Sequence, residues 1–343
     1  MGLSRVQLGG LLRTARAGHA PARALAVADS RTLVRSLFLA SGVRTGLLDA
    51  LAGGATFAQI AARTGCTRPE RLQAWLEVGA ELGEIAPRGG RYRLRGIRAR
   101  AIAGGDTMLT AHYRSMLDYQ AGCYADLAGL LVSAPGGGRA DLDDHADDIA
   151  QVSLAATAFI ETYLAGVMAQ IQPARVLDVG CGTGVYARIV ASLSPQALVD
   201  GIDLAPTVID AARAEVRAAG LAGRVRLQAG DVRTWTPEAG DGYDLILLLN
   251  NIYYFPREDR VALYRRLGSL LTRPGHLIVT TLAAPGSIAA AHLNFMLACQ
   301  AGAAALPRRG ELEADLVQAG FADIRAQPIV PSEPFLAVRA ILR

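Results

Sequence analysis

From residue 175 onward, short apolar runs alternate with segments of helical periodicity, and this alternation constrains the fold more than any other feature of the chain. Such alternation is typical of a parallel sheet with helices on both of its faces. The predicted strands are residues 176–179, 198–202, 225–228, 243–249, 276–281, 324–329 and 335–342. The predicted helices are residues 183–192, 206–219, 257–271 and 310–319. The sequence therefore predicts an α/β domain with a seven-stranded sheet over residues 165–343.

The first predicted strand runs directly into a glycine-rich turn, Val-Leu-Asp-Val-Gly-Cys-Gly-Thr-Gly, whose glycines are Gly180, Gly182 and Gly184. Glycines let the backbone approach a ligand closely, and the helix that follows points its N-terminus at that ligand. Asp203 closes the second strand 23 residues after Gly180, where a carboxylate can accept both hydroxyls of a ribose. Asp231 follows the third strand at the same edge. The pattern predicts a ligand with a ribose and a base, bound where the strand order reverses.

Two details of the turn indicate which nucleoside it binds. A dinucleotide-binding turn has its third glycine one residue later, where this chain has Val185. Asp178 lies inside the strand, two residues before the first glycine. This carboxylate would repel a pyrophosphate and attract an ammonium group. A ligand with ribose, adenine and an ammonium group is S-adenosylmethionine (SAM).

With VLDVGCGTG, then GIDL and AGDV, the chain resembles the class I SAM-dependent methyltransferases over about residues 165–343. A preceding winged-helix unit is similar to that of small-molecule methyltransferases of the natural-product O-methyltransferase type. The resemblance implies a Rossmann-like domain, preceded by a mainly α winged-helix domain that forms a homodimer. It also implies a set of cofactor-binding residues: Asp178, Gly180, Gly182, Gly184, Asp203, Leu204, Asp231, Val232 and Asn250.

In that resemblance the three glycines wrap the methionine part of SAM, with Asp178 near its amino group. Asp203 holds the ribose, and Asp231 with Val232 flanks the adenine. Asn250, just after the fourth strand, is expected near the cofactor and the mouth of the substrate pocket.

The chain departs from the family at the expected catalytic base. Many O-methyltransferases of this architecture have a histidine after the fourth strand that takes the substrate's hydroxyl proton, and here Tyr253 aligns with it. A tyrosine, with a pKa of about 10, is a poor general base at neutral pH. We therefore expect Tyr253 to orient the substrate or to line its pocket. His292 is the best remaining candidate base, and packing within its helix is the alternative role. No histidines or carboxylates in the sequence have the spacing of metal ligands, so metal-assisted methylation is not expected.

The order of helical and alternating segments in the first part of the chain predicts a winged helix over residues 31–103. Helical segments lead to a capping box at Thr67 and Glu70 that opens a third helix, and an alternating hairpin follows. Six arginines on and after the hairpin could contact nucleic acid, but the helix that would enter the groove is apolar and acidic, which favours dimerisation. Residues 1–30 are predicted to be a flexible tail, and residues 104–164 a helical connector.

Composition excludes two enzyme classes. The chain has no lysine, so it cannot form a Schiff base or build a P-loop. Four separated cysteines and a net charge of +4 favour a reducing cytoplasm and require no nucleic-acid partner. Residues 274–307 contain no charged residue, and we interpret them as a buried strand and an apolar helix rather than a membrane span.

These features together predict SAM-dependent methyl transfer to a small, largely apolar metabolite, at oxygen, carbon or nitrogen, in secondary metabolism. Two alternatives stay open at this point. The same fold could catalyse a different SAM-dependent reaction, such as a cyclisation. The chain could also be a regulator that senses SAM and binds DNA.

Overall fold

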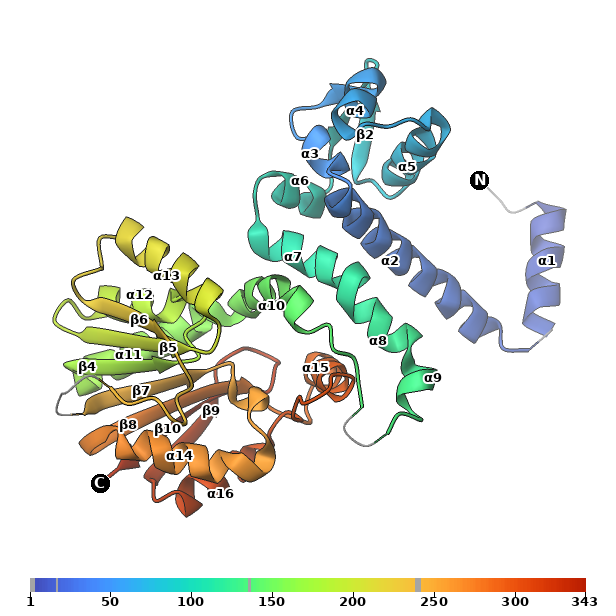
Figure 1. Ribbon diagram of the computed structural model, residues 1–343. Helices are drawn as coiled ribbons and strands as arrows, with labels where there is room; N and C mark the ends of the chain where they lie inside the picture. The colour runs from blue at the N-terminus through green and yellow to red at the C-terminus, as the bar shows by residue number, and fades with distance from the viewer. Residues whose placement is uncertain (1–3, 17, 135–136, 238–241) are drawn as a thin grey trace. The chain divides into compact units, whose positions relative to one another are not determined.

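A computed structural model describes residues 4–16, 18–134, 137–237 and 242–343 (Figure 1). By its internal contacts the chain divides into two compact units. The first comprises Met1–Tyr124 with Asp147–Val152, and the second comprises Ala125–Ala146 with Ser153–Arg343. The four-part division expected from the sequence stays a prediction, and each unit is described by itself below.

The second unit contains a seven-stranded sheet in the order β6-β5-β4-β7-β8-β10-β9. Its strands are β4 (Arg175–Val179), β5 (Leu198–Asp203), β6 (Val225–Ala229), β7 (Tyr243–Leu249), β8 (Leu271–Leu282), β9 (Ala322–Pro328) and β10 (Phe335–Leu342). Strands β4 to β8 are parallel, whereas β10 is antiparallel to both of its neighbours. The strand order reverses at β4, so the carboxyl ends of β4 and β7 flank the position where such sheets bind ligands. The predicted α/β class is confirmed.

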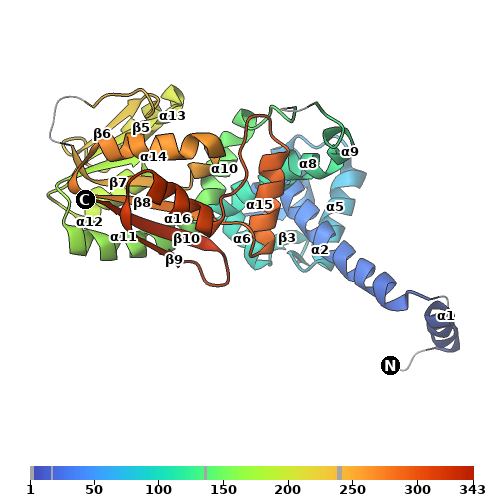
Figure 2. The ribbon, with the colours of Figure 1, turned by 90° about the horizontal axis from the view of Figure 1, so that it is seen from below.

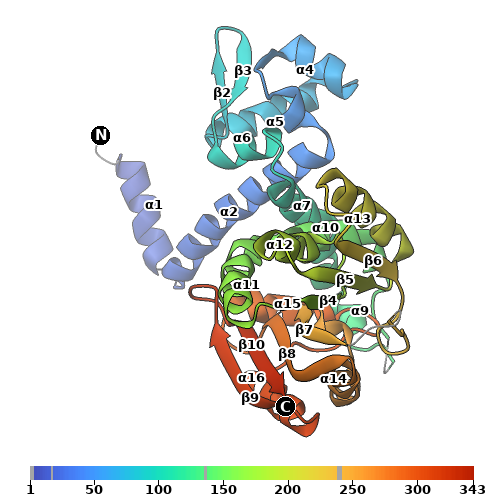
Figure 3. The ribbon, with the colours of Figure 1, turned by 90° about the vertical axis from the view of Figure 1, so that its left-hand side faces the viewer.

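Helices cover both faces of this sheet, as Figures 1 and 3 show. On one face lie α11 (Thr157–Ile171), α12 (Val185–Leu193) and α13 (Pro206–Ala218), and on the other lie α14 (Arg260–Ser269) and α16 (Arg309–Gln318). Successive strand residues serve opposite cores because side chains alternate along a strand. In β4, Val176 packs with the first group of helices and Leu177 with the second.

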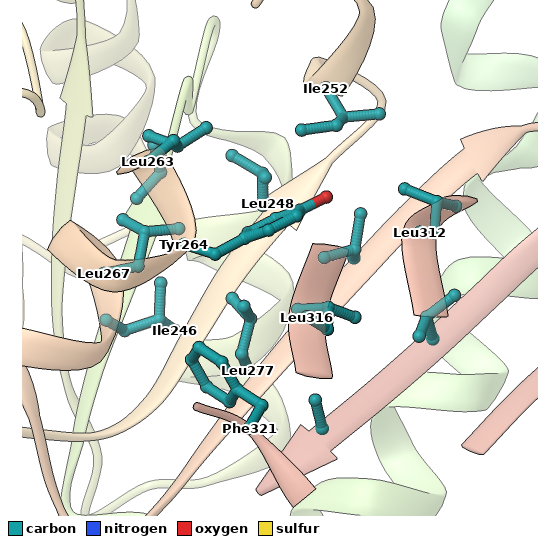
Figure 4. Close-up of a cluster of buried hydrophobic side chains, with 14 of the residues drawn as sticks. Ile246, Leu248, Ile252, Leu263, Tyr264, Leu267, Leu277, Leu312, Leu316 and Phe321 are labelled. Atoms are coloured by element: carbon teal, nitrogen blue, oxygen red, sulfur yellow. The ribbon is translucent and has the colours of Figure 1, made fainter. Parts of the chain in front are cut away.

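The second core is completed by aromatic side chains. Figure 4 shows Tyr264 and Phe321 among leucines and isoleucines from β7, β8, α14 and α16. Figure 2 shows α14 and α16 from another side, along the face of β8 and its neighbours. These buried contacts hold the carboxyl ends of the strands in fixed positions.

The remaining helices of the second unit are α9 (Leu127–Leu130) and α15 (Ile288–Ala298). Short 3₁₀ turns lie at Asp143–His145, Leu154–Ala156, Ile252–Tyr254 and Arg257–Asp259. The uncharged run over residues 274–307 contains the end of β8 and the whole of α15, as predicted. One helical stretch, Asp147–Ile171, is long and apolar enough to cross a membrane, with a mean hydropathy of 1.5. The part of it that forms α11 packs against the sheet through Ile160 and Leu164, which is the role of a core helix.

The first unit is mainly helical. Its elements are α1 (Arg5–Arg16), α2 (Ala20–Arg44), α3 (Leu47–Ala50), β1 (Ala55–Thr56), α4 (Phe57–Thr64), α5 (Pro69–Glu81), β2 (Ile85–Arg88), β3 (Arg91–Leu94), α6 (Ile97–Ala103), α7 (Thr107–Ser115), a π-helical turn (Met116–Gln120), α8 (Ala121–Ala125) and α10 (Ala146–Ser153). The last two helices reach the boundary between the units. Three strands form a small sheet in the order β1-β3-β2. The helices and hairpin follow the order that a winged helix requires, and the assignment to that class stays a prediction.

The flexible tail over residues 1–30 stays a prediction, and one other local expectation for this unit is wrong. The predicted tail contains α1, which buries no residue, and the first turns of α2, while residues 1–3 and 17 lie outside the described part. The capping box at Thr67 and Glu70 does not form, because Arg68 is the N-cap of α5 and makes no side-chain cap bond. A capping box forms instead one helix earlier, between Thr56 and Gln59.

The packing of the first unit's core predicts that a side chain at Gly79 in α5 would destabilise the unit. A Cβ there would lie 2.6 Å from the ring of Phe38 and 2.7 Å from Ile85 Cδ1. Because Phe38 also stacks on Trp75 with ring centroids 4.2 Å apart, its ring has little room to move. We expect Gly79→Ala to lower the free energy of unfolding of this unit by about 1–3 kcal/mol, the usual cost of overpacking. Urea denaturation followed by tryptophan fluorescence measures this change.

The matched control is Gly53→Ala in an exposed turn, where a Cβ meets no atom within 4 Å. That substitution should change the free energy of unfolding by less than about 0.5 kcal/mol. Equal effects of the two substitutions would contradict the packing described for α5.

Candidate active site

The glycine-rich turn between β4 and α12 has the backbone conformation that its sequence requires. Gly180, Gly182 and Gly184 have φ values of 66°, 51° and 70°, in the left-handed region where side chains cause strain. The N–H groups of Gly180 and Cys181 both donate to the carbonyl of Ile202, at 2.8 and 3.1 Å. The turn is therefore fixed against the end of the neighbouring strand β5.

Asp203, the last residue of β5, connects the two loops on this edge of the sheet. One carboxylate oxygen accepts the N–H of Gly182 at 2.9 Å, and the other accepts the N–H of Ala205 at 3.1 Å. A carboxylate has about four lone-pair sites, so each oxygen keeps acceptor capacity for a ligand. Leu204, next in the chain, is 66% exposed.

The segment after β7 closes the other side of the turn. Asn250 has a φ of 57° and is held to β8, since its N–H donates to the carbonyl of Thr280 at 2.8 Å. The buried side chain of Asn251 donates from Nδ2 to the carbonyl of Val179. A Cβ on Gly180 would overlap Nδ2 of Asn251, so only glycine fits at this position.

Asn251 is a residue that the sequence analysis missed, because it chose the preceding asparagine. Its Oδ1 is buried and has no hydrogen-bond partner, although the other end of the amide is fixed by Val179. Two adjacent asparagines after a strand carry the same sequence signal. The close approach to Gly180 distinguishes them, and this contact is visible only in three dimensions.

Asp178 is the most unusual ionisable group at this edge. It is 1% exposed, and its Oδ2 is buried without a hydrogen-bond partner. Burial, with a smaller contribution from the charge of Asp203, raises the pKa of Asp178 to about 7, while the backbone N–H of Ala187 opposes the rise. A buried carboxyl group without a cation is costly unless a ligand supplies the positive charge.

Three tyrosines surround the turn. Tyr253 is 8% exposed and lies in the 3₁₀ turn after β7, with its ring centroid 4.9 Å from that of Tyr254. Tyr186 follows the glycine turn at the start of α12, and its hydroxyl is buried with only that of Thr157 beside it. Burial raises the pKa of all three, and Tyr253, with Tyr254 and Tyr186 adding to the effect, is raised well above 10. All three hydroxyls are therefore hydrogen-bond donors at neutral pH.

The structure gives the other predicted residues surroundings of their own. Asp231 forms a bidentate pair with Arg233, which lowers the pKa of the carboxyl group, and Val232 is buried in the core. His292 lies on α15, where burial lowers its pKa. Among the residues that the structure describes, no cluster could hold a metal ion. The roles assigned to these residues from the sequence stay predictions.

Residues 176–275 match the sequence profile of a methyltransferase domain family. These residues form a methyltransferase domain. The match begins in β4 and includes the glycine turn, Asp203 and the segment after β7, which are the parts of the sheet edge described above. SAM is the cofactor of such a domain, and the role of Asp178 toward its ammonium group stays a prediction.

The methyltransferase domain has relatives among characterised proteins. A malonyl-[acyl-carrier protein] O-methyltransferase from a Paenibacillus species is 28% identical over 177 residues, which is 49% of this chain and 63% of that protein. The chain spans less than two thirds of the length of the curated relatives that head the comparison.

Solved structures share the fold over nearly the whole chain. The mitomycin 7-O-methyltransferase MmcR has a TM-score of 0.78 and 18% identity, covering 96% of this chain and 100% of that one. PigF with SAH has a TM-score of 0.74 and 20% identity, covering 92% and 98%. At these identities the likeness establishes the fold of both units and leaves substrate and assembly open.

Asp178→Asn tests the electrostatics of the methyltransferase domain. Because the pKa of Asp178 is raised in the folded state, the wild type loses stability as pH rises from about 4 to about 7, by up to about 4 kcal/mol. The neutral amide avoids this loss. We expect the variant without ligand to unfold at a higher temperature than the wild type at pH 8, and to bind SAM more weakly.

Thermal unfolding at pH 8 and pH 5 measures the first effect, and calorimetry with SAM measures the second. Asp210→Asn is the control, because Asp210 lies on the exposed side of α13 and pairs with Arg213. If Asp178→Asn lowered the melting temperature at pH 8, the buried carboxylate would have a partner that the structure does not contain.

Proposed function

We propose that this chain transfers the methyl group of SAM to a small, largely apolar metabolite in secondary metabolism. The observation that carries the proposal is the combination of Asp178, whose buried Oδ2 has no hydrogen-bond partner, with a glycine turn that Asp203 holds in place. A carboxylate for an ammonium group and a second carboxylate for a ribose fit the two polar ends of SAM. The Paenibacillus relative and MmcR, named above, are methyltransferases, so the cyclase and DNA-binding alternatives are not favoured.

Each residue has a specific part in this proposal. Asp203 accepts the ribose hydroxyls with the lone pairs that Gly182 and Ala205 leave available. Asp178 holds the ammonium group, and Gly180 lets the backbone approach the methionine part. SAM supplies an electrophilic methyl group on a sulfonium, so the chain's main task is to align the nucleophile with that methyl group.

The substrate class follows from the segment that covers this edge. Residues 288–306, from α15 to the loop after it, contain no charged residue, and Asn294 Oδ1 accepts the N–H of Leu306 at 2.8 Å to close the loop on the helix. An apolar cover favours an apolar metabolite over a sugar or a protein. Oxygen, carbon and nitrogen nucleophiles all remain compatible with this chain.

Asp203→Ala tests the cofactor assignment. Loss of hydrogen bonds to a charged group costs about 1.5–3 kcal/mol, so we expect SAM affinity to fall about ten- to a hundredfold. Isothermal titration calorimetry measures this change, with Asp210→Ala as the exposed control. Equal SAM affinity for wild type and Asp203→Ala would contradict the assignment of Asp203 to the ribose.

Transfer of label from methyl-labelled SAM to pathway intermediates then tests the reaction itself.

We further propose that the chain is a homodimer through its first unit. Helix α2 exposes Leu33, Val34 and Leu37 on consecutive turns, with 59%, 41% and 44% of their surface accessible. A two-fold interface would bury this stripe against its own copy. A stable dimer of this kind should bury more than about 2,000 Å².

The double substitution Leu33→Glu and Leu37→Glu should separate the dimer. Two carboxylates in an apolar interface are expected to weaken association by at least about thirtyfold. Light scattering at tens of micromolar measures the mass of each species. Val317→Glu, on the 62% exposed Val317 of α16, is the control and should leave the mass unchanged. A monomeric wild type with full activity would overturn the dimer proposal.

A further inference from the structure

The segment after β7 brings Tyr253 to the glycine turn through two contacts. Asn251, two residues earlier, donates to the last carbonyl of β4 and fills the space in front of Gly180. On its other side, the carbonyl of Tyr253 accepts the N–H of Ala304 at 3.3 Å, from the loop that follows α15. Tyr253 thus lies between the cofactor turn and the apolar cover.

The titratable side chains next to Tyr253 are tyrosines, whose hydroxyls donate hydrogen bonds at neutral pH. Its titratable neighbours are Tyr254, in the same turn, and Tyr186, at the start of α12. The remaining contacts of Tyr253 belong to the apolar core that it shares with Ile252 and Leu306. Asp203 faces Tyr254 rather than Tyr253 and already accepts two backbone N–H groups. In the described part of the second unit, the charged groups next to these tyrosines are Asp203, which acts on Tyr254, and Asp178, which acts on Tyr186, and neither acts on Tyr253.

The hydroxyl of Tyr253 makes no hydrogen bond within the described residues, yet the rest of its side chain is fixed by packing. Tyr186 contributes a second hydroxyl nearby, buried beside that of Thr157, and these two hydroxyls have no hydrogen-bond partner other than each other. Oriented donors without acceptors form a site for an oxygen that carries negative charge. The same group that replaces the family's base is thus suited to hold an anion.

We propose that Tyr253 is a catalytic hydrogen-bond donor, and that the substrate is an acidic enol or phenol that binds as its oxyanion. This inference rests on the proposed methyl transfer. The substrate releases its proton to water before the transfer. The bond from sulfur to methyl then breaks as the bond from the oxyanion to methyl forms, so the reaction balances without a base on the protein.

The test uses 4-nitrophenol as a coloured acidic phenol, added to the protein loaded with S-adenosylhomocysteine. Absorbance of the phenolate across a pH series reports the pKa of the bound probe. We expect that pKa to lie about one to two units below that of free 4-nitrophenol, a ten- to hundredfold shift of its ionisation towards the anion. Tyr253→Phe should remove the shift while keeping the ring and its packing.

Three controls make the test specific. Tyr254→Phe should keep the shift, because Tyr254 is 45% exposed and faces Asp203. His292→Gln should also keep it, because the proposal gives His292 no part in accepting the proton. Unchanged melting temperature and S-adenosylhomocysteine affinity in Tyr253→Phe would exclude a merely structural effect.

The outcomes separate this inference from the proposed function. If the wild type fails to bind S-adenosylhomocysteine, methyl transfer itself is wrong, and this inference falls with it. If the cofactor product binds but 4-nitrophenol does not, or its pKa is unchanged or raised, only the oxyanion site is wrong. A shift that survives Tyr253→Phe and disappears in His292→Gln would assign a proton acceptor to α15 and overturn the role of Tyr253.

Discussion

The close approach of Asn251 to Gly180 is the contact on which the rest of the site depends. Because residue 180 is a glycine, the side-chain amide of Asn251 has room to reach the carbonyl of Val179. This hydrogen bond joins the ends of β4 and β7. Asp203 fixes the same turn from the opposite side by accepting the N–H of Gly182. These contacts therefore join the carboxyl ends of three neighbouring strands at the switch point, and a preorganised site of this kind spends little binding energy on ordering itself.

Much of this arrangement could be predicted from the sequence, because alternation and turn chemistry are local signals. The predicted strands agree with the structure closely, and β7 agrees over its full length, Tyr243–Leu249. Strand β8 begins at Leu271, five residues earlier than predicted, because Arg273 and Pro274 interrupt the apolar run although the backbone continues in the sheet. Helix α1 was missed because it buries no residue, and periodicity identifies helices that pack.

The chemistry beyond the cofactor turn was harder to predict, since it depends on contacts between distant segments. The sequence placed Tyr253 at the position of the family's histidine, and its high pKa there follows from burial and from two other tyrosines. One of these, Tyr186, is 67 positions away in the chain, and no spacing rule connects the two. What the second unit places at the turn is a set of hydroxyl donors, and this favours a nucleophile that needs no help to lose its proton.

Unsatisfied polar groups gather around this turn. Asp178 Oδ2 and Asn251 Oδ1 are buried without partners, each at a cost of about 1–3 kcal/mol, and the buried hydroxyls of Tyr186 and Thr157 have only each other. The fold tolerates these groups because the apolar cores on both faces of the sheet supply the opposing stability. A ligand that pairs with even two of them relieves that cost on binding, so affinity for the ligand and stability of the bound protein rise together. The cost of these unsatisfied groups in the free protein is thus a physical reason why the site favours a ligand that has both a cation and hydrogen-bonding groups.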